Sequence, residues 1–194
     1  NNLLKLSKNI SNYCVGMEGN ISGKIKENDH TYFTIKASGS KLSTLTYDDL
    51  VDFDFNGNQL TNHKKKGSME LTFHQFLLSF DDINYVSHSH PPNTLKILCT
   101  DYSKDFSVKR LFPDQVIFNG KKSCLVPYKK PGLELNEVIK THVNLFIDSE
   151  KTFPKIILLQ NHGIIACGKT IDECIINTDI CEKSAQIFVG VLNL

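Results

Sequence analysis

Two short apolar segments near the C-terminal end of the chain limit the folds that it can adopt. Residues 155–160 form a nearly continuous apolar run, and a second run at residues 164–167 follows after Asn161, His162 and Gly163. Continuous apolar runs of this length are typical of strands that are buried on both faces of a sheet. The three-residue connection predicts a hairpin in which Gly163 adopts an unusual backbone angle. We therefore expect a central sheet that helices cover on both sides.

The rest of the sequence alternates between the periodicities of strands and helices. Alternating or apolar runs bounded by turn-forming residues predict strands at residues 20–25, 32–36, 50–55, 85–90 and 123–128. Apolar residues at helical spacing predict helices at residues 3–13, 70–80 and 133–146. A further helix can begin after the prolines at 91–92 and extend to about residue 98, and acidic residues in the first turn favour a last helix at residues 170–189. The sequence has no internal repeat, low-complexity segment or linker, so residues 1–194 are expected to form a single domain. The predicted fold class is α/β, a three-layer α/β/α sandwich in which helices flank a largely antiparallel central sheet.

Charge and composition argue against several classes of partner. The chain has 22 Lys and Arg residues against 21 Asp and Glu residues, which gives no reason to expect nucleic acid or an anionic membrane as the main partner. No segment approaches the ~20 apolar residues that cross a bilayer, and the first residues lack the pattern of a secretory signal. The six cysteines are scattered and mostly lie in apolar runs, which predicts free, buried thiols and a reducing, cytoplasmic location.

His88, Ser89 and His90 form the most informative motif. Residues two apart on a strand point to the same face, so the two imidazoles would project together where prolines end the strand. His162 lies between two apolar strands, where packing does not readily explain a histidine; the alternative is that its ring bonds a backbone carbonyl of the turn. Three imidazoles with one open position are typical of a catalytic zinc or a similar ion. The other histidines expected at the surface are His30, His63 and His142.

Glu70 is the acidic residue best placed to act with such a metal. It opens a predicted helix after Ser68, which is expected to cap that helix. One interpretation is that its carboxylate interacts only with the helix dipole; the other is that it removes a proton next to a metal-bound carbonyl. His74, one turn later, is expected either beside the site or on the helix surface. The glycine-containing turns at residues 19–23 and 37–39 are of a kind that can present N–H groups to a phosphate.

Together these motifs resemble the class II aldolase/adducin family, in particular its branch that cleaves ketose 1-phosphates. The resemblance extends over about residues 3–190, and the segments that carry it are Glu18-Gly19-Asn20-Ile21-Ser22, Ile35-Lys36-Ala37-Ser38-Gly39, Ser68-Met69-Glu70, His88-Ser89-His90-Pro91 and Leu158-Leu159-Gln160-Asn161-His162-Gly163. Members of this family have a three-layer α/β/α fold around a largely antiparallel sheet. They commonly form four-fold tetramers with active sites between subunits, so the resemblance implies a homotetramer.

The resemblance also implies a role for each motif. The residues implied to bind Zn²⁺ or another divalent ion are His88, His90 and His162. The residues implied to bind the phosphate of a small phosphorylated sugar are Asn20, Ser38, Gly39 and Ser68. Glu70 would be the catalytic base. The implied reaction is the reversible aldol cleavage of a ketose 1-phosphate into dihydroxyacetone phosphate and an aldehyde, with the metal as a Lewis acid that stabilises the enediolate.

Two departures from the family pattern keep other reactions open. Met69 occupies a position where phosphate-binding members often have a second serine, so one hydroxyl donor is lost. The tyrosine that aldolases of the family supply from a neighbouring subunit is expected near residues 112–114, where no tyrosine occurs and Asp114 is the candidate substitute.

The alternatives are a dehydratase or decarboxylating lyase, an epimerase, and an adducin-like interaction module without activity. A dehydratase or decarboxylating lyase would use the same metal ion and the same glutamate, Glu70. Epimerases of the family typically carry Asp at this position. An interaction module has no need of the three imidazoles.

Overall fold

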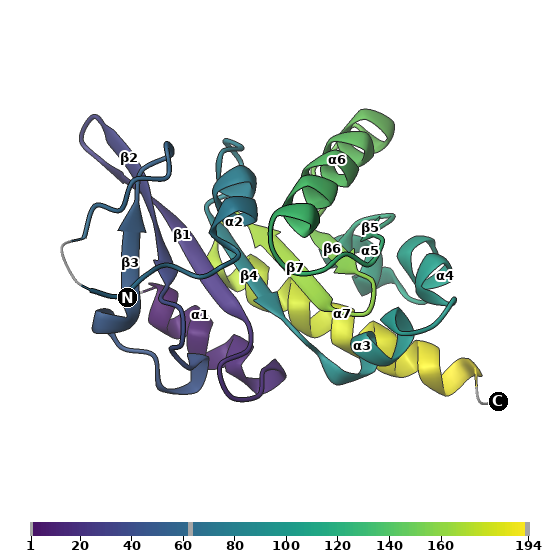
Figure 1. Cartoon of the computed structure of the whole chain (residues 1–194). Helices are drawn as coiled ribbons and strands as arrows, with labels where there is room; N and C mark the ends of the chain where they lie inside the picture. Colours follow the sequence, from purple (N-terminus) through teal and green to yellow (C-terminus); the bar gives the residue numbers. More distant parts are fainter. Residues whose placement is uncertain (1, 62–63, 193–194) are drawn as a thin grey trace.

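Seven strands of the described structure form one sheet (Figure 1). The computed structural model describes residues 2–61 and 64–192. The strands are β1 (Asn20–Glu27), β2 (His30–Lys36), β3 (Leu50–Phe53), β4 (Tyr85–Ser89), β5 (Cys124–Val126), β6 (Ile156–Leu159) and β7 (Gly163–Gly168). Their order is β3-β2-β1-β4-β7-β6-β5, and every neighbouring pair is antiparallel except β5 with β6. The prediction of a largely antiparallel sheet is confirmed.

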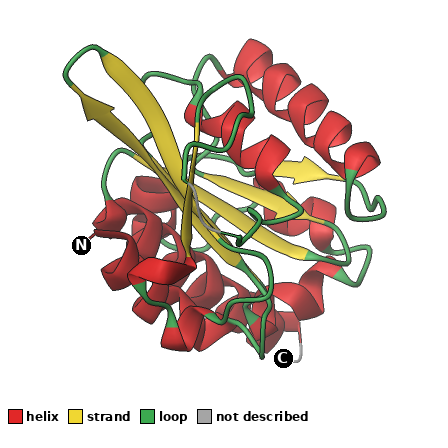
Figure 2. Ribbon diagram, turned by 60° about the vertical axis from the view of Figure 1, so that its left-hand side comes forward, coloured by secondary structure: helices red, strands yellow, loops and turns green. Residues whose placement is uncertain are grey.

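Helices cover both faces of this sheet (Figures 1 and 2). They are α1 (Asn2–Ile10), α2 (Leu71–Leu78), α3 (Pro92–Leu98), α4 (Ser103–Val108), α5 (Pro113–Asn119), α6 (Leu133–Glu150) and α7 (Ile171–Leu192), with short 3-10 turns at Ser11–Tyr13, Leu42–Thr44 and Tyr47–Asp49. Side chains of α2 and α6 pack on the face that carries Ile157 and Ile165. Side chains of α3 and α7 pack on the face that carries Ile156 and Ile164, and α1 joins α7 on that side. The three-layer α/β/α sandwich is therefore confirmed.

The apolar hairpin of β6 and β7 lies inside the sheet, as its sequence predicts. Every residue of both strands is buried. Consecutive residues point to opposite faces, so Ile157 and Leu159 meet the layer of α2 and α6 while Ile156 and Leu158 meet α7. A strand that helices cover on both sides must be apolar at every position, which explains the continuous run.

Strand pairing brings motifs that are distant in sequence to one end of the sheet. Asn20, the first residue of β1, is opposite His88 near the end of β4, and His88 is opposite Ile165 on β7. Val86 packs in the layer of α2 and α6, so His88, two residues later, points to the same face. There its ring meets Phe73 of α2, with the two ring centroids 6.1 Å apart.

The structure adds two helices to those predicted and moves the ends of several elements. The sequence does not predict α4 and α5, which have 6 and 7 residues and are too short to show a clear helical period. Strands β3 and β5 are shorter than the predicted ranges 50–55 and 123–128. Helix α2 begins at Leu71, and its N-cap position is occupied by Glu70 rather than by Ser68. Ser68 still serves the helix start, because its hydroxyl oxygen accepts the backbone N–H of Glu70 at 3.3 Å. His63 lies outside the described residues.

None of the helices in the described ranges combines the length and the apolar character that a membrane span requires.

Candidate metal centre and active site

Three histidines from two parts of the chain converge at the end of β4. His88 lies on β4, His90 directly follows that strand, and His162 lies in the turn between β6 and β7. One potential ligand atom from each residue lies within 4.8 Å of the others. The ring centroids of His88 lie 4.9 Å from those of both His90 and His162. The structure thus brings together all three residues that the sequence nominates as metal ligands.

The hydrogen bonds of His88 and His90 leave two ring nitrogens that suit a cation. The Nδ1 atom of His88 donates to the backbone carbonyl of Ile164 at 2.9 Å, which leaves its Nε2 with a lone pair. The Nδ1 atom of His90 lies 3.3 Å from Oε2 of Glu18, so this ring also presents Nε2 as a lone pair. These two Nε2 atoms are 3.1 Å apart. Burial lowers the pKa of His88 to about 3, so its ring is neutral, as metal coordination requires.

The third imidazole has an unused polar atom. The Nδ1 atom of His162 is buried and has no hydrogen-bond partner among the described residues. Its Nε2 atom lies 3.7 Å from Oε1 of Glu70. Burial lowers the pKa of His162 to about 4. Facing lone pairs and an unpartnered buried nitrogen are unfavourable in the protein alone but fit a divalent cation that accepts imidazole ligands.

The backbone of this turn differs from the expectation in its details. The residue with a left-handed conformation is Asn161, with φ of 55°, and not Gly163. Gly163 is required for a different reason: a Cβ atom there would lie 2.5 Å from Cδ2 of His90 and 2.5 Å from the carbonyl oxygen of Ser89. The glycine therefore gives the turn room to approach β4 closely, which places His162 beside the other two rings.

Glu70 lies next to this histidine cluster. Its Oε2 atom is 3.7 Å from Nε2 of His88 and accepts a hydrogen bond from the side-chain amide of Asn20 at 2.5 Å. Its Oε1 atom faces His162. Burial raises the pKa of Glu70, while the neighbouring His162 and Asn20 lower it. A carboxylate that is buried in this way is a stronger base than one in water.

The sequence left two positions open for His74, one beside the site and one on the helix surface. The structure places it beside the site. Its ring is fully buried and contacts the side chains of Ser22 and Asn20 through its two nitrogens. Asn20 therefore links His74 to Glu70.

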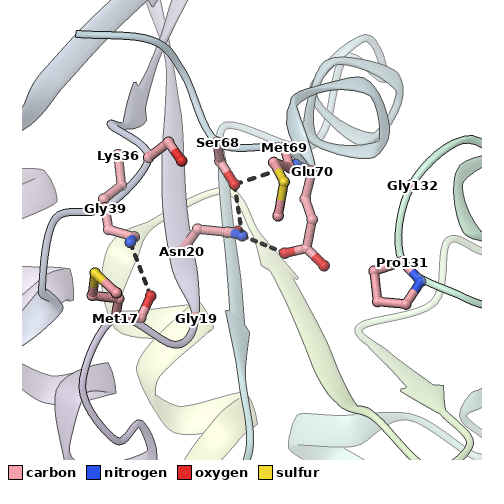
Figure 3. A pocket seen from close by; sticks show the side chains of 11 residues that line it. Met17, Gly19, Asn20, Lys36, Gly39, Ser68, Met69, Glu70, Pro131 and Gly132 are labelled. Atoms are coloured by element: carbon pink, nitrogen blue, oxygen red, sulfur yellow. Dashed lines mark hydrogen bonds between the residues drawn. The ribbon is translucent and has the colours of Figure 1, made fainter.

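A pocket of about 360 Å³ adjoins Glu70 (Figure 3). The residues that line it include all four of the predicted phosphate-binding residues, Asn20, Ser38, Gly39 and Ser68. The lining is completed by Met17, Gly19, Lys36, Met69, Glu70, Pro131 and Gly132. The amide of Asn20 turns toward Glu70 and Ser68 (Figure 3).

The sequence model of the class II aldolase and adducin N-terminal domain matches residues 6–189. This chain belongs to the class II aldolase and adducin family. Among its relatives is an L-fuculose phosphate aldolase from Methanococcus maripaludis strain C7, which is 33% identical over 184 residues that cover 94% of this chain and 90% of the relative. A 3-oxo-tetronate 4-phosphate decarboxylase from Escherichia coli K12 is 26% identical over 90% of this chain and 77% of the relative.

The fold of this class II aldolase family member also matches solved structures. A sugar-phosphate aldolase from Thermotoga maritima superimposes with a TM-score of 0.79 at 21% sequence identity, covering 98% of this chain and 93% of that one. The match confirms the fold class that the resemblance implies.

Sequence motifs do not mark every residue that lies at the site of this class II aldolase family member. Glu18 and Lys36 lie in segments that carry the resemblance, but nothing in the local sequence marks them as site residues. Asp114 is exposed in the first turn of α5 and does not line the pocket of its own chain.

Proposed function

We propose that this chain is a metal-dependent lyase that catalyses the reversible aldol cleavage of a small ketose 1-phosphate into dihydroxyacetone phosphate and an aldehyde. The observation that carries the proposal is the position of Glu70 between two different sites. On one side are the imidazoles of His88 and His162, each 3.7 Å from a carboxylate oxygen. On the other side is the pocket that also contains the predicted phosphate-binding residues.

The two oxygens of Glu70 have different surroundings, which supports Oε1 as the basic one. Oε2 accepts the hydrogen bond from Asn20, and the backbone N–H of Glu70 is held by the hydroxyl oxygen of Ser68. The first contact holds the carboxylate, and the second holds the backbone that carries it. Oε1 has no hydrogen bond among the described residues, so it is the oxygen that takes the proton from the hydroxymethyl carbon of the triose phosphate.

The three histidines would hold the metal that this reaction needs. We propose Zn²⁺, or another divalent ion that accepts nitrogen ligands, bound by His88, His90 and His162. When bound, the ion would polarise the substrate carbonyl and stabilise the negative charge that forms when the proton leaves.

We also propose that the protein forms a homotetramer and that it is located in the cytoplasm. Met17 and Met69 line the pocket and are 60% and 82% exposed, and Leu133 nearby is 81% exposed. Exposed apolar side chains at a pocket entrance support contact with another subunit there. All six cysteines are free, and four are buried, which supports a reducing compartment.

Proton exchange tests the half-reaction that is assigned to Glu70. The metal-loaded protein is incubated with dihydroxyacetone phosphate in heavy water, and loss of the hydroxymethyl proton signal is followed by NMR. We expect stereospecific exchange without any aldehyde. The matched control is Glu134→Gln, because Glu134 is also in the first turn of a helix but is exposed and outside the pocket. No exchange in protein that contains its metal would reject the aldolase proposal.

Glu70→Gln and His162→Ala separate the base from the ligands. Glu70→Gln is expected to retain the metal and to lose nearly all exchange, because the amide cannot accept the proton. His162→Ala is expected to lose both the bound metal and the proton exchange. His142→Ala serves as the control and is expected to lose neither. Bound metal is measured by elemental analysis. Equal loss of metal in Glu70→Gln and His162→Ala would show that Glu70 is a ligand instead of the base.

A decarboxylating lyase is the second candidate. It is favoured by the 26% identity to the 3-oxo-tetronate 4-phosphate decarboxylase and by Met69, which removes one hydroxyl from the predicted phosphate site. The metal-loaded protein is tested with a 3-oxo-tetronate 4-phosphate for release of CO₂. Release of CO₂ without proton exchange on dihydroxyacetone phosphate would replace the first candidate with the second.

A further inference from the structure

His90 is held differently from its neighbour His88, although both belong to the proposed metal centre. His88 lies inside β4, where its backbone is paired with Asn20 of β1 and Ile165 of β7. His90 follows Ser89, the last residue of β4, and so lies just beyond the pairing of this strand with β7. Because ligand atoms must be held close to their productive geometry, the backbone of His90 needs other contacts to fix it.

The segment after His90 begins a helix that cannot cap itself. Pro91 occupies the N-cap position of α3, and Pro92 is the first residue of that helix. Proline has no side-chain acceptor, so the free backbone N–H groups at the start of α3 need a partner from elsewhere in the chain. The two prolines also have nearly fixed φ angles, which leaves little rotational freedom between His90 and α3. A contact that holds the first turn of α3 therefore also restrains His90.

Glu182 of α7 supplies the missing acceptor. Its Oε1 atom accepts the backbone N–H of Asn93 at 2.9 Å and the side-chain amide of the same residue at 2.8 Å. Its Oε2 atom accepts the backbone N–H and the hydroxyl of Thr94, both at 2.9 Å. Hydrogen bonds to a charged acceptor are stronger than those between neutral groups, and the negative charge also suits the start of a helix. Helices α3 and α7 lie side by side and share one apolar cluster (Figure 1).

The backbone of His90 itself is also tied to α7. Its N–H donates to the carbonyl oxygen of Tyr13 at 3.1 Å. The hydroxyl of Tyr13 in turn donates to Oδ1 of Asp179 at 2.7 Å. Asp179 and Glu182 are three residues apart and so lie on the same side of α7. Asp179 is exposed and makes this contact in competition with water, whereas Glu182 is half-buried, so Glu182 is the stronger support.

We propose that Glu182 is a positioning residue for the metal ligand His90. Its carboxylate fixes the first turn of α3, and the two prolines transmit that constraint to the histidine. The inference rests on the metal site of the proposed function but not on the reaction, because it concerns the geometry of the imidazoles before any substrate binds. None of the sequence motifs that indicate the site lies in α7, so the last helix gains a part in the metal centre.

Metal affinity in the absence of substrate tests this role. The affinity for Zn²⁺ is measured by competition with a chelator in the wild type, in Glu182→Ala and in Glu182→Gln. We expect Glu182→Ala to bind the ion about tenfold more weakly, as is common when a group that orients a ligand is removed. Glu182→Gln keeps one side-chain oxygen as an acceptor and loses the other. Its affinity is therefore expected to lie between those of the wild type and Glu182→Ala.

Glu173→Ala is the matched control for the loss of a helix-end contact. Glu173 is also on α7, and its Oε2 atom accepts the backbone N–H of Lys169 at 2.7 Å, at the end of β7 that is remote from the histidines. Glu173→Ala and Glu182→Ala are both expected to lower the melting temperature of the metal-free protein, but only Glu182→Ala should weaken metal binding. A folded Glu182→Ala that binds Zn²⁺ as tightly as the wild type would overturn the proposal.

NMR identifies the ligand that is affected. Histidine labelled with ¹⁵N is incorporated, and the imidazole signals of the Zn²⁺-loaded proteins are compared, with each signal assigned by substitution of its histidine. In Glu182→Ala, the signals of His90 are expected to shift or broaden, while those of His88 and His162 stay close to their wild-type positions. Equal changes in all three imidazoles would mean that Glu182 supports the fold as a whole, which would overturn its role as a positioning residue for His90.

Proton exchange on dihydroxyacetone phosphate then separates this inference from the proposed function. Weaker metal binding in Glu182→Ala, together with no exchange in the metal-loaded wild type, would support the role of Glu182 while rejecting the aldolase reaction. Exchange in the wild type, together with unchanged metal affinity in Glu182→Ala, would support the reaction while rejecting the role of Glu182.

Discussion

The Nδ1 atom of His74 lies 2.7 Å from the hydroxyl oxygen of Ser22, and both residues are fully buried. The other ring nitrogen contacts the side-chain oxygen of Asn20, whose amide nitrogen donates to Glu70. Because that amide nitrogen faces Glu70, Nε2 of His74 must carry the hydrogen, and Ser22 must donate to Nδ1. Burial lowers the pKa of His74 well below its usual value, so the ring stays neutral. Three side chains, those of Ser22 and Asn20 on β1 and of His74 on α2, thus fix the orientation of the proposed base.

Substitution of His74 is expected to reduce catalysis without removing the metal. In His74→Ala, the amide of Asn20 is free to rotate, so Glu70 loses its fixed position. Loss of such supporting contacts typically costs about 10- to 100-fold in activity, and we expect a decrease of this size in kcat for proton exchange. KM is expected to rise less than kcat falls, because Ser38, Gly39 and Ser68 keep their places in the pocket and only Asn20 is released. His142→Ala is the control, and a parallel loss of metal or a large rise in KM would contradict a positioning role.

Glu18 is expected to strengthen metal binding through His90. Its carboxylate lies 3.3 Å from Nδ1 of His90, which orients the ring and increases the basicity of the opposite nitrogen. Because the side chain of Glu18 is 45% exposed, we expect Glu18→Gln to weaken metal affinity by only about tenfold. Competition with a chelator measures this affinity. Glu27→Gln is the control, because Glu27 is exposed and lies at the far end of β1. Equal metal affinities in Glu18→Gln and Glu27→Gln would exclude a role for Glu18.

Gly163→Ala is expected to damage both the fold and the metal centre. Its methyl group would overlap with the ring of His90 and the carbonyl of Ser89, so the turn or the ring must shift. We expect a loss of about 1–3 kcal/mol in the free energy of unfolding and weaker metal binding. Gly190→Ala is the opposite case, because nothing lies within 4 Å of the added methyl group in helix α7. There stability is expected to rise, by at most about 1 kcal/mol. Urea unfolding and metal analysis of both variants test the contrast.

Asp49 is expected to stabilise the fold in a pH-dependent way. Hydrogen bonds from Ser40, then from Lys65 and Thr46, hold its pKa well below its usual range. A depressed pKa in the folded state means that the contribution is complete above the unfolded value of about 4 and is lost as the pH falls below it. Asp49→Asn is therefore expected to cost about 1–2 kcal/mol at pH 7 and much less near pH 3.

Urea unfolding at both pH values measures this difference. The exposed neighbour substitution Asp48→Asn is the control. A loss of equal size at the two pH values would mean that the charge of Asp49 is not responsible.

The sequence predicted the parts of the site that follow from local periodicity. Strand parity placed His88 and His90 on one face, and the interrupted apolar run marked His162 as a turn residue. Glu18 could not be found in this way, because what places it at the site is its contact with His90. The reason for Gly163 could not be predicted either. A glycine is needed there because β4 leaves no room for a side chain, and not because of its backbone angle. Helices α4 and α5 were missed because fewer than two full turns leave little periodic signal.

Asn20 and His88 stand opposite each other on β1 and β4, and this register restricts how the chain can vary in length. Inserting or deleting one residue within the paired stretch would turn the following side chains to the opposite face of the sheet, away from Glu70. Substitutions elsewhere in the strands leave the register intact. The turn at Asn28 and Asp29 lies at the other end of β1, where extra residues would not disturb the pairing with β4. Insertions among homologous chains are therefore expected at that turn and excluded from the ladder that begins at Asn20.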